Sequence, residues 1–417
     1  MSDWQHGFYK VDPQTRRERL TAGLHLPQSV TQALAEHATT LGNELVENYL
    51  TDYSLPEGVG LNLTVNGQEY VVPMVVEEPS VIAAASNGAK RVQASGGFTA
   101  PEQHRELVGQ VVLTDVNDVP GTVKKLTAQR DHLLAVANAA HPSMQRRGGG
   151  AQSMTVRTPG DFISVDLGIN VCQAMGANSV NTMAEAVGRE LTAQGYHVLV
   201  AILSNLATNS LQTVSCDVDF AKLSTKEQSG EQVAQQIAKL SALAQVDPFR
   251  AATHNKGIMN GIDAVMIASG NDWRAIESGA HAYAARSGQY RGLSTWKVVD
   301  GKLHGEMTLP LPVGVVGGSI GLNPMTKLNY QISKIKTAEE LAAVTASLGL
   351  AQNLAALRAL ATTGIQAGHM KLQYRSLAVS VGAKPAEVPQ VAAQLAKCTH
   401  VDQETARLVL AKIREDQ

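Results

Sequence analysis

The spacing of apolar residues predicts helices and then a β-hairpin in the first part of the chain. Leu41 and Leu45 lie four residues apart, and the pattern around them predicts mainly helix over residues 15–50. Residues 59–76 instead alternate or run apolar, which is typical of strands. Asn66-Gly67 interrupts this run, and an Asn-Gly pair between two strands favours a tight hairpin turn.

Residues 105–208 have a regular order of strands and helices. The pattern predicts strands at 107–113, 154–157, 162–171 and 196–203, with helices at 123–139 and 178–194. The resulting β-α-β-β-α-β order is that of the ferredoxin-like fold. We therefore predict a small ferredoxin-like domain in this part of the chain.

From residue 209 onward the apolar spacing is mainly helical, and it is clearest in residues 341–357. Residues 383–417 predict one or two further helices. These patterns predict an α+β fold with an inserted domain. The expected parts are a large, mainly helical domain of residues 1–104 and 209–363, an inserted domain of residues 105–208, and a C-terminal segment of residues 364–417.

Composition and charge narrow the class of protein. Charged residues make up 17% of the chain, below the roughly 25% of an average globular protein, and hydrophobic residues make up 44%. A large core or a sizeable subunit interface is therefore expected. The net charge of −2 provides no basic excess for a nucleic-acid partner.

The cysteines and the N-terminal residues indicate a compartment. Cys172, Cys216 and Cys398 are widely spaced and show neither a C-x-x-C nor a zinc-ligand pattern, so no metal site is expected. We see no signal-peptide pattern and no uninterrupted apolar stretch of about 18 residues. A reduced, cytoplasmic protein without a membrane segment is therefore the expectation.

Most common motifs of nucleotide-binding and hydrolytic enzymes are absent from the sequence. There is no G-x-G-x-x-G, no G-x-x-x-x-G-K-[ST] and no H-E-x-x-H. Residues 317–321 match G-x-S-x-G, and a nucleophile elbow of that pattern needs a strand, a sharp turn and a helix. Pro312 and Asn323-Pro324 disfavour that context for Ser319. A Gly-rich turn is the simpler interpretation, and a phosphate-contacting loop is another.

Two acidic residues follow the apolar run at residues 71–76. Glu77 and Glu78 precede Pro79-Ser80 and a small, apolar stretch at 81–89. A solvated rim is the simpler interpretation of these carboxylates. A carboxylate against an apolar surface would be desolvated, which favours its protonated form and would make Glu78 a candidate acid.

The densest block of polar residues and glycine extends over residues 250–274. Lys256 within this block could extend to the surface, or, if buried, could polarise a carbonyl group. Asp272 precedes a predicted helix, and helix N-cap is its simpler role. Pairing of Lys256 with Asp272 would require the chain to fold back.

Two further segments are candidates on weaker local grounds. His369 lies in Gly-His-Met near the end of the long helical region, where a structural or surface histidine is the simpler interpretation. Residues 173–178, Gln-Ala-Met-Gly-Ala-Asn, join a predicted strand to a predicted helix. Small residues at a helix N-terminus let a phosphate approach backbone N–H groups.

Taken together and in order, these blocks resemble the class II (bacterial) hydroxymethylglutaryl-coenzyme A (HMG-CoA) reductases. The resemblance covers roughly residues 46–375. It depends on the segments 76–86, 174–185, 246–286, 314–318 and 368–370.

The resemblance implies roles for particular residues. The expected catalytic residues are Glu78, directly before the proline, Lys256 of the Asn-Lys-Gly-Ile-Met-Asn-Gly block, Asp272 of Gly-Asn-Asp-Trp-Arg, and His369 of Gly-His-Met. Residues matching positions near the substrate are Ser80, Arg250, Asn260 and Asn271. The expected cofactor-binding residues are His141, Gln173, Met175, Gly176, Ala177, Asn178, Gly317 and Gly318.

The resemblance also implies a reaction and an assembly. The reaction is the four-electron reduction of (S)-3-hydroxy-3-methylglutaryl-CoA to (R)-mevalonate and coenzyme A with two NAD(P)H, through a hemithioacetal and mevaldehyde, in isoprenoid biosynthesis. The large domain would bind the acyl-CoA, the inserted domain the nicotinamide nucleotide, and a C-terminal flap would carry His369. The sites would lie between the subunits of a homodimer or of an assembly of dimers.

The residue chemistry fits this reaction. The Lys256 ammonium could stabilise each developing oxyanion, and a protonated Glu78 could supply protons to oxygen. Asp272 would tune and position both groups. His369 as a cation could protonate the departing CoA thiolate.

Two departures from the family pattern affect the cofactor site. Members often have an aspartate where this chain has Gln173, so a role for an acid there is in doubt. NADH-preferring relatives have an aspartate at the position of His141, where it would bind a ribose hydroxyl and repel a 2′-phosphate. Arg146 and Arg147 lie nearby in sequence. NADPH is therefore the expected cofactor and NADH the second candidate.

Two other classes of function stay open from the sequence. One is a serine hydrolase that acts on an acyl-CoA through Ser319. The other is a CoA-binding or structural homologue without catalysis, which the presence of all four expected catalytic residues disfavours.

Overall fold

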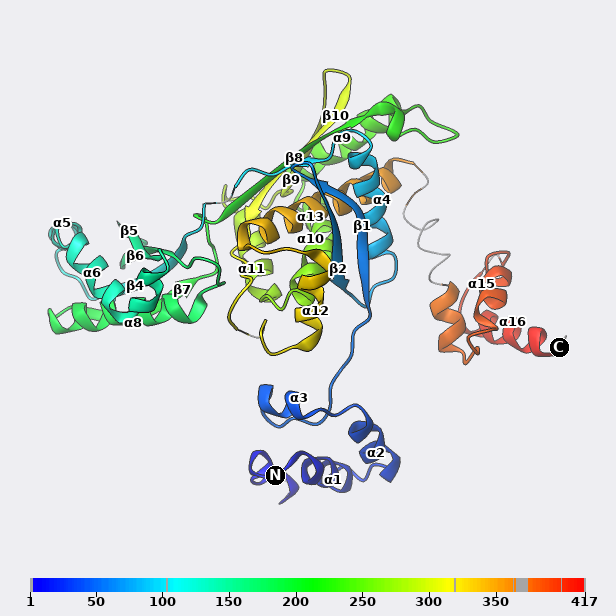
Figure 1. Cartoon of the computed structure of the whole chain (residues 1–417), viewed down its shortest axis with the longest axis horizontal. Helices are drawn as coiled ribbons and strands as arrows, with labels where there is room; N and C mark the ends of the chain where they lie inside the picture. The colour runs from blue at the N-terminus through cyan, green and yellow to red at the C-terminus, as the bar shows by residue number, and fades with distance from the viewer. Residues whose placement is uncertain are drawn as a thin grey trace. The chain divides into compact units, whose positions relative to one another are not determined.

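The chain divides into two compact units, Met1–Pro56 and Glu57–Gln417 (Figure 1). The structure is a computed structural model that describes residues 3–102, 104–318, 320–362, 364, 374–398 and 400–415. His369 and Ser319, two residues singled out from the sequence, lie outside the described residues.

The N-terminal unit is helical, as the sequence predicted. It contains α1 (Pro13–Gly23), α2 (Gln28–Glu36) and α3 (Thr40–Leu45), after two short 3-10 turns at Asp3–Gln5 and Phe8–Lys10. Arg16 and Arg17 are buried, and their guanidinium groups donate to the main-chain carbonyls of Tyr49 and Leu50. These polar contacts tie α1 to the segment after α3.

A six-stranded sheet organises the second unit. Its strands are β1 (Glu57–Val65), β2 (Gln68–Val75), β3 (Phe98–Thr99), β8 (Leu211–Asp219), β9 (Ser294–Val299) and β10 (Lys302–Pro310), in the order β2-β1-β3-β8-β10-β9. The predicted β1–β2 hairpin is confirmed, because Val65 pairs with Gln68 and both Asn66 and Gly67 have positive φ.

The strands β8, β9 and β10 were not expected from the sequence, which predicted mainly helix after residue 209. Their buried residues alternate, as in β10, where Leu303, Gly305 and Met307 face the core. Gly305 occupies a buried position of β10, and Gln212 occupies one of β8. These two residues weaken the apolar alternation by which the strands could have been predicted. The α+β prediction itself is confirmed.

Helices pack around this sheet and supply most of the core. They are α4 (Val81–Gln93), α9 (Gly230–Val246), α10 (Pro248–Ala268), α11 (Trp273–Ala284), α12 (Pro324–Ser333) and α13 (Ala338–Ala361). α13 is buried on nearly all sides and packs against α4 and α10. At Gly88 of α4 a Cβ would lie 2.0 Å from the carbonyl oxygen of Ala351, so glycine is needed where these helices meet.

α13 also has a composition that would suit a membrane span. Among the described residues it is the one helix long and apolar enough for this, but 78% of its most apolar window is buried inside the protein. Its position at the centre of the core accounts for that composition.

The segment between β3 and β8 has a ferredoxin-like fold with a sheet and an apolar cluster of its own. It contains β4 (Leu107–Thr114), α5 (Val119–Ala128), α6 (Arg130–Ala140), α7 (Pro142–Arg146), β5 (Gly150–Arg157), β6 (Ile163–Asn170), α8 (Ala177–Ala193) and β7 (His197–Ser204). The sheet is antiparallel with the order β5-β6-β4-β7, which confirms the predicted topology.

One helix of the ferredoxin-like segment differs from the helix predicted from the sequence. The helix expected at 123–139 is broken at Gln129 into α5 and α6. Leu126 and Leu133 are both buried and lie seven residues apart, so the apolar stripe continues across the break. Periodicity alone therefore could not reveal it.

The C-terminal segment is helical, as predicted. Residues 374–380 are helical and are followed by α15 (Val388–Leu395) and α16 (Gln403–Glu415). These helices share a small apolar cluster that includes Val391, Leu395 and Leu410.

Candidate active site

An ion pair joins two of the four expected catalytic residues. The Nζ atom of Lys256, in the middle of α10, lies 2.6 Å from Oε2 of Glu78, in the turn between β2 and α4. Their side chains are 59% and 36% exposed, so Lys256 is not the buried lysine of one sequence-based hypothesis. Glu78 contacts the Lys256 ammonium group, and Val81, Ala83 and Ala84 line the same cavity. A carboxylate and a proton donor thus face the same space.

The cavity beside this ion pair, here called the α10 cavity, has a volume of about 480 Å³. It is lined by Glu78, Ser80, Val81, Ala83, Ala84, Arg250, Thr253, Lys256, Gly257, Asn260, Gln352, Ala355, Ala356, Ala359 and Leu360. Arg250, Thr253 and Asn260 reach it from one face of α10, because residues three or four apart lie on the same side of a helix. Three of the expected substrate residues therefore lie beside Lys256. Thr253 was missed, although its spacing from Lys256 could have indicated it.

Arg250 is a half-buried cation at the wall of the α10 cavity. Burial lowers the pKa of its guanidinium, and its Nε is buried with no hydrogen-bond partner among the described residues. A buried donor without a partner costs free energy. Arg250 also lines the α10 cavity, and a guanidinium at a cavity wall pairs favourably with a carboxylate. Ser80 has φ of +73°, a strained backbone conformation for serine, at the start of α4.

A buried polar network holds α10 through His254 and Asn255, which precede Lys256 in the helix. His254 Nε2 lies 2.7 Å from Oγ of Ser294, and that hydroxyl donates to Asn353 of α13. The Asn255 side chain bonds the main chain of Arg291 and Leu293. These contacts fix the rotation of α10 and hence the direction of Lys256.

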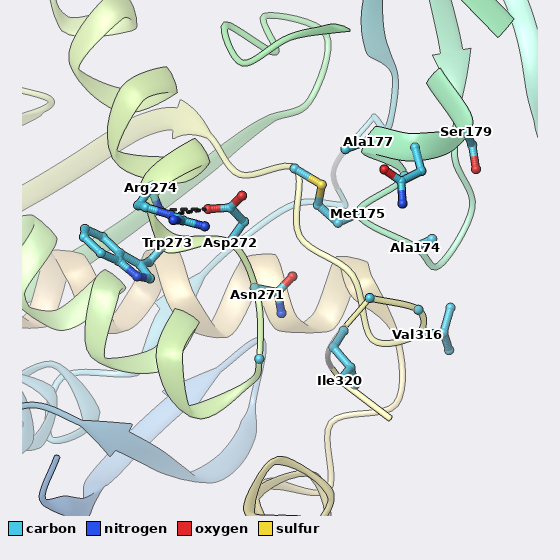
Figure 2. Close-up of a pocket in the computed structure, with 15 residues that line it drawn as sticks. Ala174, Met175, Ala177, Ser179, Asn271, Asp272, Trp273, Arg274, Val316 and Ile320 are labelled. Carbon is cyan, nitrogen blue, oxygen red and sulfur yellow. Dashed lines mark hydrogen bonds and ion pairs between the residues drawn. The ribbon is translucent and has the colours of Figure 1, made fainter. Parts of the chain in front are cut away.

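A second cavity of about 480 Å³, here called the α8 cavity, lies between three loops (Figure 2). It is lined by Ala174, Met175, Gly176, Ala177, Asn178, Ser179, Gly270, Asn271, Asp272, Trp273, Arg274, Val316, Gly317, Gly318 and Ile320. Figure 2 shows Asn271 and Asp272 on one side and Ala177 and Ser179 on the other. Six of the expected cofactor residues and two further expected site residues therefore gather here.

Main-chain groups line the α8 cavity at two places, the start of α8 and the glycine pair Gly317–Gly318. Gly176, with φ of +86°, precedes α8, and no side chain caps that helix. A Cβ at Gly176 would lie 2.3 Å from Val171, so only glycine fits. Gly317 and Gly318 also have positive φ, and their Cβ positions are open. Such small surfaces beside a helix N-terminus fit a phosphate group.

Asp272 has the structural role that the sequence indicated. Its Oδ1 accepts hydrogen bonds from the main-chain N–H groups of Arg274 and Ala275 and so caps α11. The side chain remains 43% exposed at the α8 cavity. Capping therefore positions the carboxylate without removing it from the cavity.

Lys256 and Asp272 do not come together within one chain. Lys256 lies twelve residues before the end of α10, which is about 18 Å along a helix axis. The α10 and α8 cavities share no lining residue in the described part of the chain. Each cavity holds only part of the expected catalytic set.

The sequence matches the family described as Hydroxymethylglutaryl-coenzyme A reductase over residues 12–374. The chain belongs to this family. Its members are nicotinamide-dependent oxidoreductases that convert HMG-CoA to mevalonate, so the enzyme class predicted from the sequence is confirmed.

Similar proteins come from archaea and bacteria. The chain is 40% identical to 3-hydroxy-3-methylglutaryl-coenzyme A reductase of Archaeoglobus fulgidus over 99% of this chain and 95% of that protein. It is 33% identical to the probable reductase of Borreliella burgdorferi over 80% and 77% of the two chains.

Solved reductase structures from Streptococcus pneumoniae are also similar. One is 46% identical, with a TM-score of 0.76 over 99% of this chain and 100% of that chain. Another, a class II reductase bound to NADPH in open conformations, is 46% identical with a TM-score of 0.77 over 97% and 100%. The class II resemblance of the sequence is therefore confirmed.

Two expected cofactor residues of this reductase-family chain lie beside the α8 cavity. His141 contacts the hydroxyl of Ser179, which lines the cavity, with Nε2 and Oγ 3.2 Å apart. Gln173 directly precedes the lining segment, and its amide bonds the start of α13. No group of residues suited to a metal ion occurs within the described ranges.

The context of Ser319 does not match a nucleophile elbow. β10 ends at Pro310 and the next helix, α12, begins only at Pro324. An elbow needs the strand and the helix on either side of one sharp turn. The family assignment and this spacing both disfavour the hydrolase alternative.

We expect His254 to make the fold sensitive to mild acid. Burial, with a smaller effect of the Arg250 charge, lowers the pKa of His254 to about 4. Unfolded histidine titrates near 6.5, so between those values the unfolded chain binds a proton that the folded chain excludes. Stability should therefore fall as the pH decreases from 6.5 toward 4, by on the order of 2–3 kcal/mol for this residue.

Urea unfolding at pH 7.5 and pH 4.5 would measure this effect. His254→Gln should lose less stability between the two pH values than the parent does, whatever its stability at pH 7.5. His37→Gln, at an exposed histidine, should keep the parent's pH dependence. Equal losses in the parent and in His254→Gln would contradict the assignment.

Proposed function

We propose that this chain reduces HMG-CoA to mevalonate with two NADPH, using Glu78, Lys256, Asp272 and His369 at a site shared between two subunits. The observation that carries this is the Lys256–Glu78 pair at the α10 cavity, with Arg250, Ser80 and Asn260 around it. We propose the biosynthetic direction and a cytoplasmic protein, with residues 1–104 and 209–363 binding the acyl-CoA.

The α10 cavity suits the hydroxymethylglutaryl group. The positively charged Arg250 lines this cavity, and the substrate ends in a carboxylate. Asn260, one turn beyond Lys256 on α10, adds an amide beside the ammonium group. The thioester carbonyl would then lie within reach of Lys256.

The α8 cavity suits the nicotinamide nucleotide. The uncapped start of α8 and the open backbone at Gly317 and Gly318 fit the phosphates. Residues 105–208, which contain α8, are therefore the proposed nucleotide-binding domain. The nucleotide supplies a hydride in each of the two reduction steps.

The separation of the two cavities supports a shared site. Asp272 lies at the α8 cavity and Lys256 at the α10 cavity, and one chain does not join them. A second copy would bring its α8 cavity to the first copy's α10 cavity in a symmetric dimer. We therefore propose a homodimer, or an assembly of dimers, with intersubunit sites.

Different residues of the chain then stabilise the oxyanions and supply the protons. The Lys256 ammonium stabilises the oxyanion that forms when hydride reaches the thioester carbon, and again when hydride reaches mevaldehyde. When the hemithioacetal collapses, the C–S bond breaks and His369, on the proposed flap at residues 364–417, protonates the CoA thiolate. Glu78, after it takes up a proton from solvent, supplies the proton that the final alkoxide accepts. Asp272 positions these groups. Two protons and two hydrides are consumed for each CoA released.

Lys256→Ala should lower kcat by about a hundredfold to a thousandfold, the effect of removing one oxyanion-stabilising donor. The measurement is loss of nicotinamide absorbance with HMG-CoA, in parallel with thiol release. The parent should oxidise two NADPH for each CoA. Lys239→Ala, at an exposed lysine of α9, is the matched control and should keep the parent rate. Near-normal turnover by Lys256→Ala would refute the proposed mechanism.

NADPH should be the preferred cofactor. His141 lies at the edge of the α8 cavity beside Ser179, and it carries no negative charge to repel a 2′-phosphate. His141→Asp should shift the ratio of kcat/KM for NADPH over NADH toward NADH by about tenfold, or roughly 1.4 kcal/mol. A parent enzyme with kcat/KM for NADH about tenfold above that for NADPH would contradict this assignment.

A further inference from the structure

Arg105 is a buried cation behind the α8 cavity. Its side chain is only 5% exposed. The guanidinium donates to the main-chain carbonyls of Cys172, Ala174 and Val313 at 3.0, 3.2 and 2.7 Å. Ala174 begins one wall of the cavity, and Val313 lies three residues before another. One side chain therefore holds the backbone behind two walls.

Two further side chains anchor this arginine to α13. Glu339, in the first turn of α13, has Oε1 3.4 Å from Nε of Arg105. Gln173 donates from Nε2 to Glu339 Oε2 at 3.0 Å, and its Oε1 accepts from the N–H of Ala338 at 2.7 Å. We call Arg105, Gln173 and Glu339 the Arg105 clasp. It attaches the loop before α8 to the most buried helix of the protein.

The walls of the cavity are also joined to one another in front of the clasp. The N–H of Val315 donates to the carbonyl of Gln173 at 2.9 Å, and Ala174 forms a bridge with Val316. A Cβ at Gly314 would lie 2.3 Å from the Met175 nitrogen, so these two segments touch backbone to backbone.

The third wall of the cavity, residues 270–274, is attached to Gly314. Asn271 Oδ1 accepts from the N–H of Gly314 at 2.8 Å, and its Nδ2 donates to the Gly314 carbonyl at 3.0 Å. Asn271 directly precedes Asp272. The three walls of the cavity thus form one connected unit, and a displacement of one wall would be passed to the others.

The charges of the clasp are balanced only if position 173 is neutral. Arg105 carries one positive charge and Glu339 one negative charge in a poorly solvated region. A carboxylate at position 173 would stand about 3 Å from Glu339, and two carboxylates that close repel each other. Glutamine keeps the same shape and donates instead. The clasp therefore gives the neutral Gln173 a structural role in this chain.

We propose that the Arg105 clasp positions the nucleotide pocket. It sets the distance between the start of α8 and the Gly317–Gly318 loop, and so sets the affinity for the phosphates of the nucleotide. The identity of that ligand as NADPH depends on the proposed function, whereas the mechanical coupling of the clasp to the cavity walls does not. Arg105 and Glu339 are thus positioning residues, because they act through the loops that they hold.

Three variants test the clasp. Glu339→Gln removes the carboxylate, and Gln173→Glu adds a second one. Each should raise the KM for NADPH about tenfold or more, with kcat and the KM for HMG-CoA within about threefold of the parent. The double variant Gln173→Glu/Glu339→Gln moves the single carboxylate across the same hydrogen bond and should return the KM toward the parent value.

Asp166→Asn, at a buried carboxylate paired with Arg157 elsewhere in the domain, should leave the KM for NADPH unchanged.

Hydrogen exchange without any ligand gives a second readout that does not depend on turnover. Exchange over residues 172–180 and 311–318 should be faster in both single variants and slower again in the double variant. If those segments exchange at the parent rate in the single variants, or if the double variant is no better than either single one, the clasp proposal is overturned. A rise of both KM values together, with general destabilisation, would also overturn it. If the parent does not use NADPH but exchange follows the expected pattern, the clasp stands and the proposed function fails.

Discussion

One helix, α10, contributes both to a buried polar network and to a cavity where it places two cations. His254 and Asn255 bond to residues of β9, α13 and the loop before β9, and these bonds set the rotation of the helix. Arg250 and Lys256 of this helix both line the α10 cavity. The ion pair with Glu78 across 178 residues of sequence depends on this rotation. The buried contacts of His254 and Asn255 therefore determine where the charged side chains of α10 lie.

The proposed catalytic groups are divided between two cavities. Lys256 and Glu78 belong to the α10 cavity, whereas Asp272 and the glycine-rich loops belong to the α8 cavity. Both cavities are attached to α13, one by its lining residues and the other by the contacts of Glu339 with Arg105 and Gln173. A rigid central helix therefore gives each cavity a fixed frame. The reaction itself would then require that two copies of the chain meet.

Much of the fold could be predicted from the sequence, because several of its features depend on short segments. The Asn66-Gly67 turn, the ferredoxin-like order and the N-cap role of Asp272 all depend on local preferences that short segments express by themselves. The strands β8 and β10 were missed because Gln212 and Gly305 occupy core positions. The break at Gln129 leaves no signal in the apolar stripe.

The contacts of the site were less predictable than its members. The family resemblance named several residues of each cavity in advance, but it did not indicate their division into two groups. Lys256 pairs with Glu78, a contact between distant segments that no spacing rule supplies. The role of Gln173 depends on Arg105 and Glu339, neither of which belongs to a recognisable motif. Long-range pairing of this kind becomes visible only in the folded chain.

The most direct measurement of the shared-site account is activity after mixing two inactive variants, Lys256→Ala and Asp272→Asn. If each site takes Lys256 from one subunit and Asp272 from the other, subunit exchange creates mixed dimers with one intact site and one doubly altered site. An equal mixture should then recover about a quarter of the parent rate, since half of the dimers are mixed and one of their two sites is intact. No recovery, with mixed dimers shown to be present, would mean that each chain supplies its whole catalytic set and would contradict the account.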